Sequence, residues 1–169
     1  FRVRGNPFLE IASVRNADLR WEWYPNEEDS LSIALFYKDI DKPIERVVQL
    51  ASGTAGNSRT FRNAESGELS GVEIEGRKEF LLSDDLSRSL FVSFNASVIE
   101  SKVTLVNDDP RELQGQPEYT ANLVIGYDDF SNGQQLTFLV NQNGASIADV
   151  GLSGAPDVYL EPRMEANLV

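Results

Sequence analysis

Apolar and polar residues alternate with a period of two along most of this chain of 169 residues. That period places every second side chain on the same face of a β-strand, and clusters of Gly, Asn, Asp and Pro separate the alternating runs. Helical periodicity is scarce, so the pattern predicts an all-β protein without βαβ units. Seven strands are expected, over residues 12–24, 31–40, 69–80, 89–101, 117–127, 134–143 and 157–169.

The two faces of these expected strands differ in polarity. One face, called the apolar face below, carries Leu19, Trp21, Trp23, Leu31, Ile33, Leu35, Tyr37, Val72, Ile74, Val92, Phe94, Ala96, Val98, Tyr119, Ala121, Leu123, Ile125, Tyr127, Leu136, Phe138 and Val140, with no charge among them. The opposite face, called the polar face, carries Asp18, Arg20, Glu22, Lys38, Glu73, Glu75, Arg77, Asn95, Asn122 and Asn141. Such a division fits a soluble sandwich with the apolar face inside and equally a membrane barrel with that face outside.

The connections between the strands favour the barrel, because short and long connections alternate along the chain. The short ones are residues 25–30, 81–88 and 128–133, and the long ones are 41–68, 102–116 and 144–156. In an up-and-down meander all short turns then lie at one end and all long loops at the other, as in outer-membrane barrels. Strands of about ten residues, at roughly 3.3 Å per residue and a tilt near 45°, also match the apolar band of about 25 Å in such barrels.

Composition narrows the possible functions. With 15 Lys and Arg against 27 Asp and Glu, the net charge is −12, which argues against nucleic acid as a partner. Cysteine and histidine are absent, which excludes disulfides, thiolate metal sites and histidine-based catalysis. No apolar run approaches the roughly 18 residues of a membrane helix. We therefore expect one domain, no cofactor and no helical membrane anchor within the chain.

One long segment and two shorter ones carry a family resemblance. GNPFLEIASVRNADLRWEWYPNEEDSLSIALFYKDIDKPIERVV contains a Gly-Asn-Pro-x-Leu segment, an Asn-x-Asp-Leu strand, an aromatic-ended turn and a Leu-Ser-x-x-x-Phe-Tyr-Lys-x-Ile strand. The residues concerned are Gly5, Asn6, Pro7, Leu9, Asn16, Asp18, Leu19, Trp23, Tyr24, Leu31, Ser32, Phe36, Tyr37, Lys38 and Ile40. SGVEIEGRKEF and LQGQPEYTANLVIGYDD follow in the same order. Together they resemble the late barrel strands of TonB-dependent receptors of the Gram-negative outer membrane.

This resemblance implies that residues 1–169 are one partial barrel domain, a fragment of a larger receptor. We find no plug domain, TonB-box segment or final strand ending in an aromatic residue, and a barrel of this kind has 22 strands. The parent receptor is expected to import a scarce nutrient, such as a ferric siderophore, a corrinoid or an oligosaccharide, without being an enzyme. Its expected partners are the receptor's own plug and remaining strands, TonB, outer-membrane lipid and the small-molecule nutrient.

The resemblance also assigns roles to particular residues. The expected lipid-facing residues of the first hairpin are Leu19, Trp21, Trp23, Leu31, Ile33, Leu35 and Tyr37. Loop 41–68 is the candidate for contact with the nutrient, because loops much longer than about a dozen residues tend to be functional or disordered. In it, IERVVQL and SRTFRNA are expected to pair, with ASGTAGN at the tip. Arg46, Arg59, Arg62 and Phe61 could meet an anionic chelate or stack on a sugar, or they could support neighbouring loops.

Two other functions fit parts of the same pattern. A soluble extracellular β-sandwich that binds carbohydrate or protein would place Trp21 and Trp23 in its core. A glycosidase would use Glu73 and Glu75, whose Cα atoms would lie about 6.5 Å apart on one strand. Exposure to solvent, or pairing with an arginine such as Arg77, explains them more simply. The acidic pairs lack the spacing of a calcium-binding loop and are interpreted as turn residues that aid solubility: Asp39 and Asp41, Asp108 and Asp109, Asp128 and Asp129.

Overall fold

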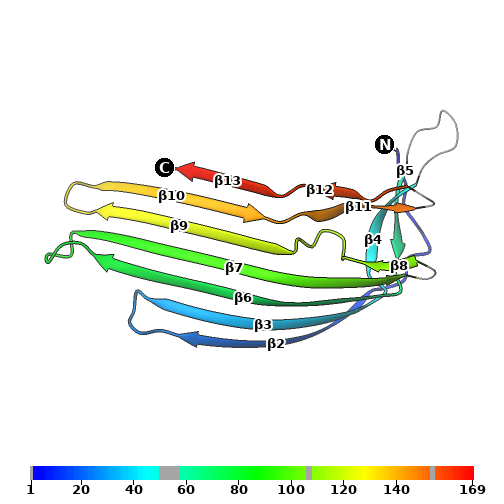
Figure 1. Cartoon of the computed structure of the whole chain (residues 1–169), viewed down its shortest axis with the longest axis horizontal. Coiled ribbons are helices and arrows are strands. Elements are labelled where there is room, and N and C mark those ends of the chain that lie inside the picture. The colour runs from blue at the N-terminus through cyan, green and yellow to red at the C-terminus, as the bar shows by residue number, and fades with distance from the viewer. Residues whose placement is uncertain (1, 50–57, 106–107, 153–154) are drawn as a thin grey trace.

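The computed structural model describes residues 2–49, 58–105, 108–152 and 155–169, and its long strands run lengthwise through the molecule (Figure 1). Most of them form one antiparallel sheet in the spatial order β2, β3, β6, β7, β9, β10, β13. Their bounds are β2 Ser13–Trp23, β3 Ser30–Asp41, β6 Ser66–Leu81, β7 Arg88–Leu105, β9 Tyr119–Asp129, β10 Gln134–Asn143 and β13 Arg163–Leu168, with β8 Asp108–Arg111 beside β7. The described residues contain no helix that could cross a membrane.

The order of the strands confirms the predicted up-and-down meander. The short turns lie at one end, on the left of Figure 1, and the long loops at the other, and these are called the short-turn end and the long-loop end below. The predicted strand 157–169 is wrong in one respect, because it is broken at Glu161 and Pro162. Proline has no N–H to donate to a ladder. The first half, β12 (Val158–Leu160), joins a second sheet.

The break at Pro162 has a counterpart on the neighbouring strand. Gly144 and Ala145 separate β10 from β11 (Ser146–Leu152), and the pairing of β11 with β12 continues the register of β10 with β13. The four strands therefore form one long hairpin with a kink. Beyond this kink, β11 and β12 belong to the second sheet.

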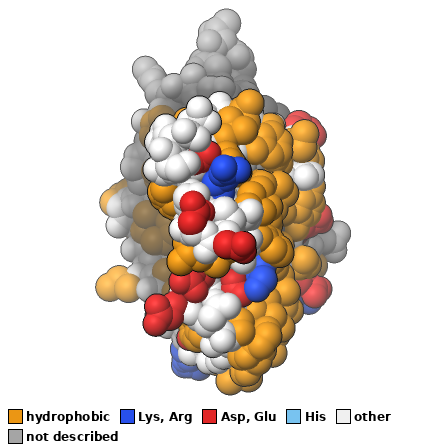
Figure 2. Space-filling model, turned by 90° about the vertical axis from the view of Figure 1, so that its left-hand side faces the viewer, with side chains coloured by type: hydrophobic (Ala, Val, Ile, Leu, Met, Phe, Trp, Pro, Cys, Tyr) orange, Lys and Arg blue, Asp and Glu red, His pale blue; other side chains and the backbone are white. Residues whose placement is uncertain are grey.

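The pairing register sets the apolar face in continuous rows across the main sheet. Read from β2 to β9, three rows are Trp23–Leu31–Gly76–Phe94–Leu123, Trp21–Ile33–Ile74–Ala96–Ala121 and Leu19–Leu35–Val72–Val98–Tyr119. Trp21 and Trp23 keep 53% and 52% of their surface exposed, so this face is not the core of a sandwich. Figure 2 looks at the short-turn end and shows hydrophobic side chains gathered along one flank.

Charged residues bound the apolar face at the long-loop end. A row of Arg15, Asp39, Glu68 and Lys102 crosses four strands there. Toward the short-turn end, Val92 and Leu90 of β7 continue the apolar rows, although the partner of Val92 on β6 is Lys78. Five rows spaced two residues apart span roughly 20–25 Å along strands tilted by about 40°, close to the apolar band of membrane barrels.

The polar face is joined by side-chain interactions across the strands. Arg20 forms ion pairs with Glu22 on its own strand and with Glu75 on β6. In the row that contains Glu22 and Glu75, Asn122 donates a hydrogen bond of 2.6 Å from its Nδ2 to Oδ1 of Asn95. The alternation predicted from the sequence therefore corresponds to two chemically distinct surfaces of one sheet.

A second sheet lies at the long-loop end, with the strand order β1, β5, β4, β11, β12. Its further strands are β1 Arg2–Val3, β4 Ile44–Gln49 and β5 Ser58–Asn63. The predicted hairpin of loop 41–68 is confirmed as β4 and β5, which are called the arm below, whereas the predicted tip ASGTAGN lies outside the described residues. Two parallel pairings, β4 with β11 and β1 with β5, were not predicted.

The arm brings a small hydrophobic core to the long-loop end. The chain leaves β3 through Lys42, whose φ of 53° lies in the left-handed region, and Pro43. Val47 of the arm then packs with Ile147 and Val150, and all three are buried. The described part of the main sheet is open by comparison, because apolar residues line one side of it without a covering layer.

Each of the three short turns is organised by an aspartate. In the β2–β3 turn, Asp29 accepts hydrogen bonds of 2.9 Å from Nδ2 of Asn26 and from the backbone N–H of Glu79. The ammonium of Lys78 also pairs with Asp29 and is the main cause that lowers the pKa of this carboxyl to about 2. A buried acidic group thus closes this turn.

The other two turns use the same device. Asp85 accepts hydrogen bonds from the hydroxyl groups of Ser83 and Ser87, which lower its pKa to about 2. Asp129 accepts bonds of 3.1 and 3.2 Å from the backbone N–H groups of Ser131 and Asn132. Aspartate is favoured in turns because its short side chain reaches backbone groups two or three residues ahead.

Candidate functional site

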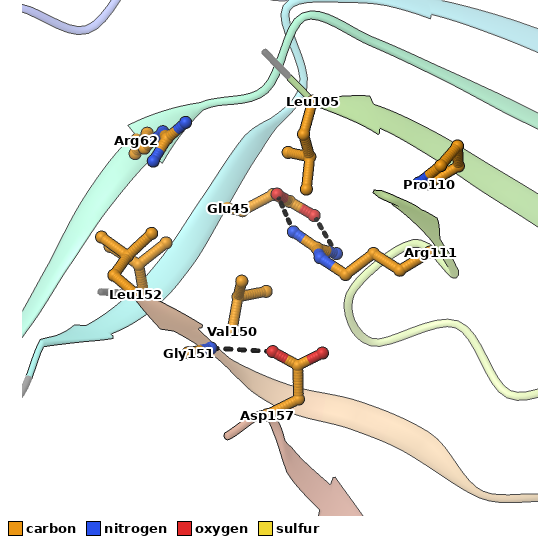
Figure 3. A pocket seen from close by; sticks show the side chains of 10 residues that line it. Glu45, Arg62, Leu105, Pro110, Arg111, Val150, Gly151, Leu152 and Asp157 are labelled. Atoms are coloured by element: carbon orange, nitrogen blue, oxygen red, sulfur yellow. Dashed lines mark hydrogen bonds and ion pairs between the residues drawn. The ribbon is translucent and has the colours of Figure 1, made fainter. Parts of the chain in front are cut away.

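The candidate site is a cavity of about 280 Å³ at the long-loop end, between the arm and the last residues of the main sheet (Figure 3). The arm contributes three residues to its wall, and β7, β8, β11 and the segment before β12 supply the rest. The lining residues are Glu45, Val47, Arg62, Leu105, Pro110, Arg111, Val150, Gly151, Leu152 and Asp157. Leu105 follows the alternation of the polar face, so the arm lies over that face.

A two-pronged ion pair crosses the cavity. Arg111 of β8 donates from Nη1 to Oε1 of Glu45 at 2.9 Å, and its Nη2 pairs with the other oxygen (Figure 3). Glu45 is only 3% exposed, and Arg111 also donates to the carbonyl oxygen of Glu112 at 3.0 Å. The bidentate geometry neutralises a buried carboxylate and joins the arm to β8.

A second buried carboxylate holds two of the predicted ligand residues. Asp149 of β11 is 1% exposed and forms ion pairs with Nε of Arg46 and, at 2.6 Å, with Nη2 of Arg59. Arg46 also donates from Nη2 to the carbonyl oxygen of Ala148 at 2.7 Å. Arg46 and Arg59 therefore attach the arm to β11, as the supporting role considered for them requires.

Gln114 adds a third attachment, which the sequence analysis missed. Its Oε1 accepts from the backbone N–H of Arg46 at 2.6 Å, and its Nε2 donates to the carbonyl oxygens of Arg46 and Ala148, each at 2.8 Å. The side-chain amide of Gln114 thus forms hydrogen bonds with the backbone of both β4 and β11, as a backbone amide of an intervening strand would. The only available signal was the segment LQGQPEY, which was identified for its resemblance rather than for this contact.

The other two predicted residues lie on opposite faces of the arm. Arg62 lines the cavity and stands directly across the hairpin from Glu45 (Figure 3). Phe61 stands across from Arg46, on the face that carries Arg59, and is 37% exposed. The structure therefore does not bring the four predicted residues into one cluster.

Gly151 and Asp157 shape the remaining side of the cavity. A Cβ at Gly151 would come within 1.9 Å of the carbonyl oxygen of Ala155, so only glycine fits where the chain turns back. The N–H of Gly151 donates to Oδ1 of Asp157 at 2.8 Å (Figure 3). This bond draws the segment before β12 against β11 and fixes the edge of the cavity.

The two carboxylates considered for glycoside hydrolysis occupy the polar face without forming a pocket. Glu75 is paired with Arg20 of β2, two strands away, and not with Arg77 as predicted. Instead, Cζ of Arg77 lies 4.3 Å from the centre of the Phe91 ring, and its Nη2 lies 3.8 Å from Oε2 of Glu79. Among the described residues, no cluster of three or more metal-ligating side chains is found.

An antiparallel meander with one apolar face, one polar face and long loops that fold back at one end is a section of the wall of a transmembrane β-barrel. Residues 1–159 match the family described as TonB dependent receptor-like, beta-barrel, and the chain belongs to this family. The match confirms the resemblance to a C-terminal part of such a barrel. Among curated proteins, none matches the chain. The family comprises TonB-dependent receptors of the outer membrane, which are transporters and not enzymes.

Proposed function

We propose that this chain is part of the wall of an outer-membrane receptor that takes up a scarce nutrient, with energy supplied through TonB. One observation carries the proposal: an unbroken register of seven strands separates apolar from polar side chains over the height of a membrane. In this wall the predicted lipid-facing residues contact the acyl chains. The polar face meets the plug domain and the lumen of the parent receptor.

The arm is the part of the chain that we assign to the nutrient. Arg46 and Arg59 are engaged by Asp149, so they support the arm and leave Arg62 and Phe61 as contact residues. Within the described residues, Arg62 is exposed and has no carboxylate partner, which suits an anionic group such as that of a ferric siderophore. Phe61 offers a ring for stacking on an oligosaccharide or a corrinoid.

Uptake assays on the full-length receptor test this assignment. A strain that lacks the receptor is complemented with the wild type, R62A, F61A or the control R15A, which removes an exposed arginine from the charged row on the apolar face. Ferric siderophores, corrinoids and oligosaccharides are supplied in turn as the limiting nutrient. We expect R62A to reduce uptake of an anionic chelate, or F61A that of a sugar or corrinoid, by about tenfold, with R15A unchanged.

Two results would count against the proposal at different levels. Normal growth of the strain without the receptor on every nutrient would contradict the uptake function. Normal uptake by both arm variants, in a receptor that does transport one of the nutrients, would leave the function intact but remove the arm from the ligand path.

A further inference from the structure

A second cavity lies at the short-turn end, on the apolar face. The β6–β7 hairpin extends beyond the β2–β3 hairpin there (Figure 1), and an open groove of about 450 Å³ occupies the step between them. The apolar walls of the groove are Trp23, Leu31, Gly76, Val92 and Phe94. Its size falls within the roughly 300–1,000 Å³ of ordinary small-molecule sites.

Gly76 creates the floor of this groove. It stands between Leu31 and Phe94 in one row of the apolar face. A Cβ at this position would meet Cε1 of Phe94 at 2.8 Å, so the ring of Phe94 lies directly against the backbone of β6. The ring of Phe94 therefore occupies the place of the missing side chain, and the groove lies beside this ring, with Trp23 and Leu31 also in its wall.

A positive charge lies at the edge of the groove that is nearer to the tip of the β6–β7 hairpin. Lys78 lies on the apolar face of β6, opposite Val92, so the prediction that this face carries no charge is wrong at this position. Its ammonium pairs with Asp29, which is 4% exposed, and lies 5.9 Å from the centre of the Phe80 ring. The side chain of Lys78 is 55% exposed, so the ammonium keeps donors free for a group outside the protein.

Negative charges follow directly beyond this lysine. Glu27 and Glu28 are exposed in the β2–β3 turn, next to the aspartate that holds Lys78. From the groove outward, the surface therefore reads apolar, then positive, then negative. An amino-phospholipid carries the complementary sequence of groups: an acyl chain, a negative phosphate and a positive ammonium.

We propose that this groove binds one membrane phospholipid with an amine headgroup. An acyl chain lies over Gly76 between Trp23 and Phe94, the phosphate accepts hydrogen bonds from Lys78, and the headgroup ammonium meets the turn carboxylates. A purely anionic headgroup would lack this last contact and would face Glu27 and Glu28 with the wrong charge. The proposal uses the membrane orientation of the apolar face and is independent of which nutrient is transported.

Native mass spectrometry of the full-length receptor, purified in detergent, tests the proposal. The protein is titrated with phosphatidylethanolamine, and in parallel with phosphatidylglycerol, whose headgroup has no amine. The groove variant is G76L, which places a side chain on the floor, and the matched control is A121L, which places a leucine two strands away on the same face. K78Q removes the ammonium, and K102Q removes a lysine at the other end of the face.

We expect one bound phosphatidylethanolamine per receptor, weakened about tenfold by G76L and by K78Q but not by A121L or K102Q. Phosphatidylglycerol should bind more weakly to the wild type. Should G76L fail to fold, as judged by its heat-dependent mobility on a gel, V92F narrows the same groove from its side. Equal binding by the groove variants and their controls would overturn the site, and equal binding of both lipids would overturn the headgroup assignment.

Discussion

Val47 and Ile147 at the long-loop end are almost fully buried, whereas Leu19 and Trp21 on β2, the first strand of the main sheet, are more than half exposed. The first region has a core and two buried carboxylates, each neutralised by arginine. The second has no such core within the described residues, since one side of the sheet is polar and the other apolar. The comparison shows that one chain combines a locally packed region with a region whose apolar side is left uncovered by the described residues.

The largest effect is expected when the surroundings are removed altogether. The isolated 169-residue chain should aggregate in detergent-free buffer, because β2 and β13 expose unpaired strand edges and the apolar face exceeds the few hundred Å² that monomers tolerate. Sedimentation velocity of the purified chain measures this. A cooperatively folded monomer in that buffer would restore the soluble sandwich.

Breaking the packed region from within should have the next largest effect. The double substitution R46A and R59A leaves the buried carboxylate of Asp149 without its two ion pairs. Loss of one side of a buried pair costs about 3–5 kcal/mol, so β4 should open much more readily. Hydrogen exchange of the amides of residues 44–49 in the full-length receptor measures the opening.

The control for this substitution is R62A, on the same arm but exposed. It should change the opening free energy by no more than about 0.5 kcal/mol, as is usual for surface positions. Unchanged protection of β4 in the double variant would mean that Asp149 is not what holds the arm.

Charge insertion distinguishes the two faces of the open region. Ile33 and Ala34 are adjacent on β3, but Ile33 belongs to the apolar face and Ala34 to the polar face. Arginine at a lipid-facing midplane position costs about 2–4 kcal/mol, whereas the same change toward the lumen should be mild. Folding yield of I33R and A34R in bilayers measures the difference, and equal damage would refute the assignment of the faces.

Acidification should produce the smallest effect, confined to the short turns. The folded pKa of Asp29 is about 2, against an ordinary value of 3.8, so its contribution is present above about pH 4 and is lost as the pH falls toward 2. In D29N this pH dependence should be weaker than in the wild type, because only Asp85 and Asp129 still contribute to it, while E27Q, in the same turn but exposed, should keep it in full. The measurement is the unfolding free energy of the wild type, D29N and E27Q between about pH 2 and 5. The same pH dependence in all three would show that Asp29 does not stabilise the turn.

The open region was the part that the sequence predicted well. Alternation is a local property, so the positions of Trp21, Ile33 and Leu123 on one face follow from counting along each strand. The alternation of short and long connections then sets the order of the strands. Two features were predicted wrongly: the break at Pro162, and the charge of Lys78 on the face that was expected to carry none.

The packed region was predicted less well because its contacts join distant parts of the chain. The arm hairpin was expected, since its two strands are close in sequence, but its parallel partner β11 lies about a hundred residues away. Periodicity carries no information on such pairing. For the same reason Arg46 and Arg59 were recognised as charged loop residues without their partner Asp149, and Glu75 was paired with the nearby Arg77 instead of Arg20.

The aspartates of the short turns bear on how the wall assembles. A turn closed by its own side chains brings the two strands of its hairpin together over a short loop, at a small cost in chain entropy. In the main sheet every strand pairs with the next strand of the meander, so no strand has to pair across another one. Each hairpin can therefore form before the neighbouring one, and the wall can grow hairpin by hairpin, with the slow, long-range contacts of the arm left until last.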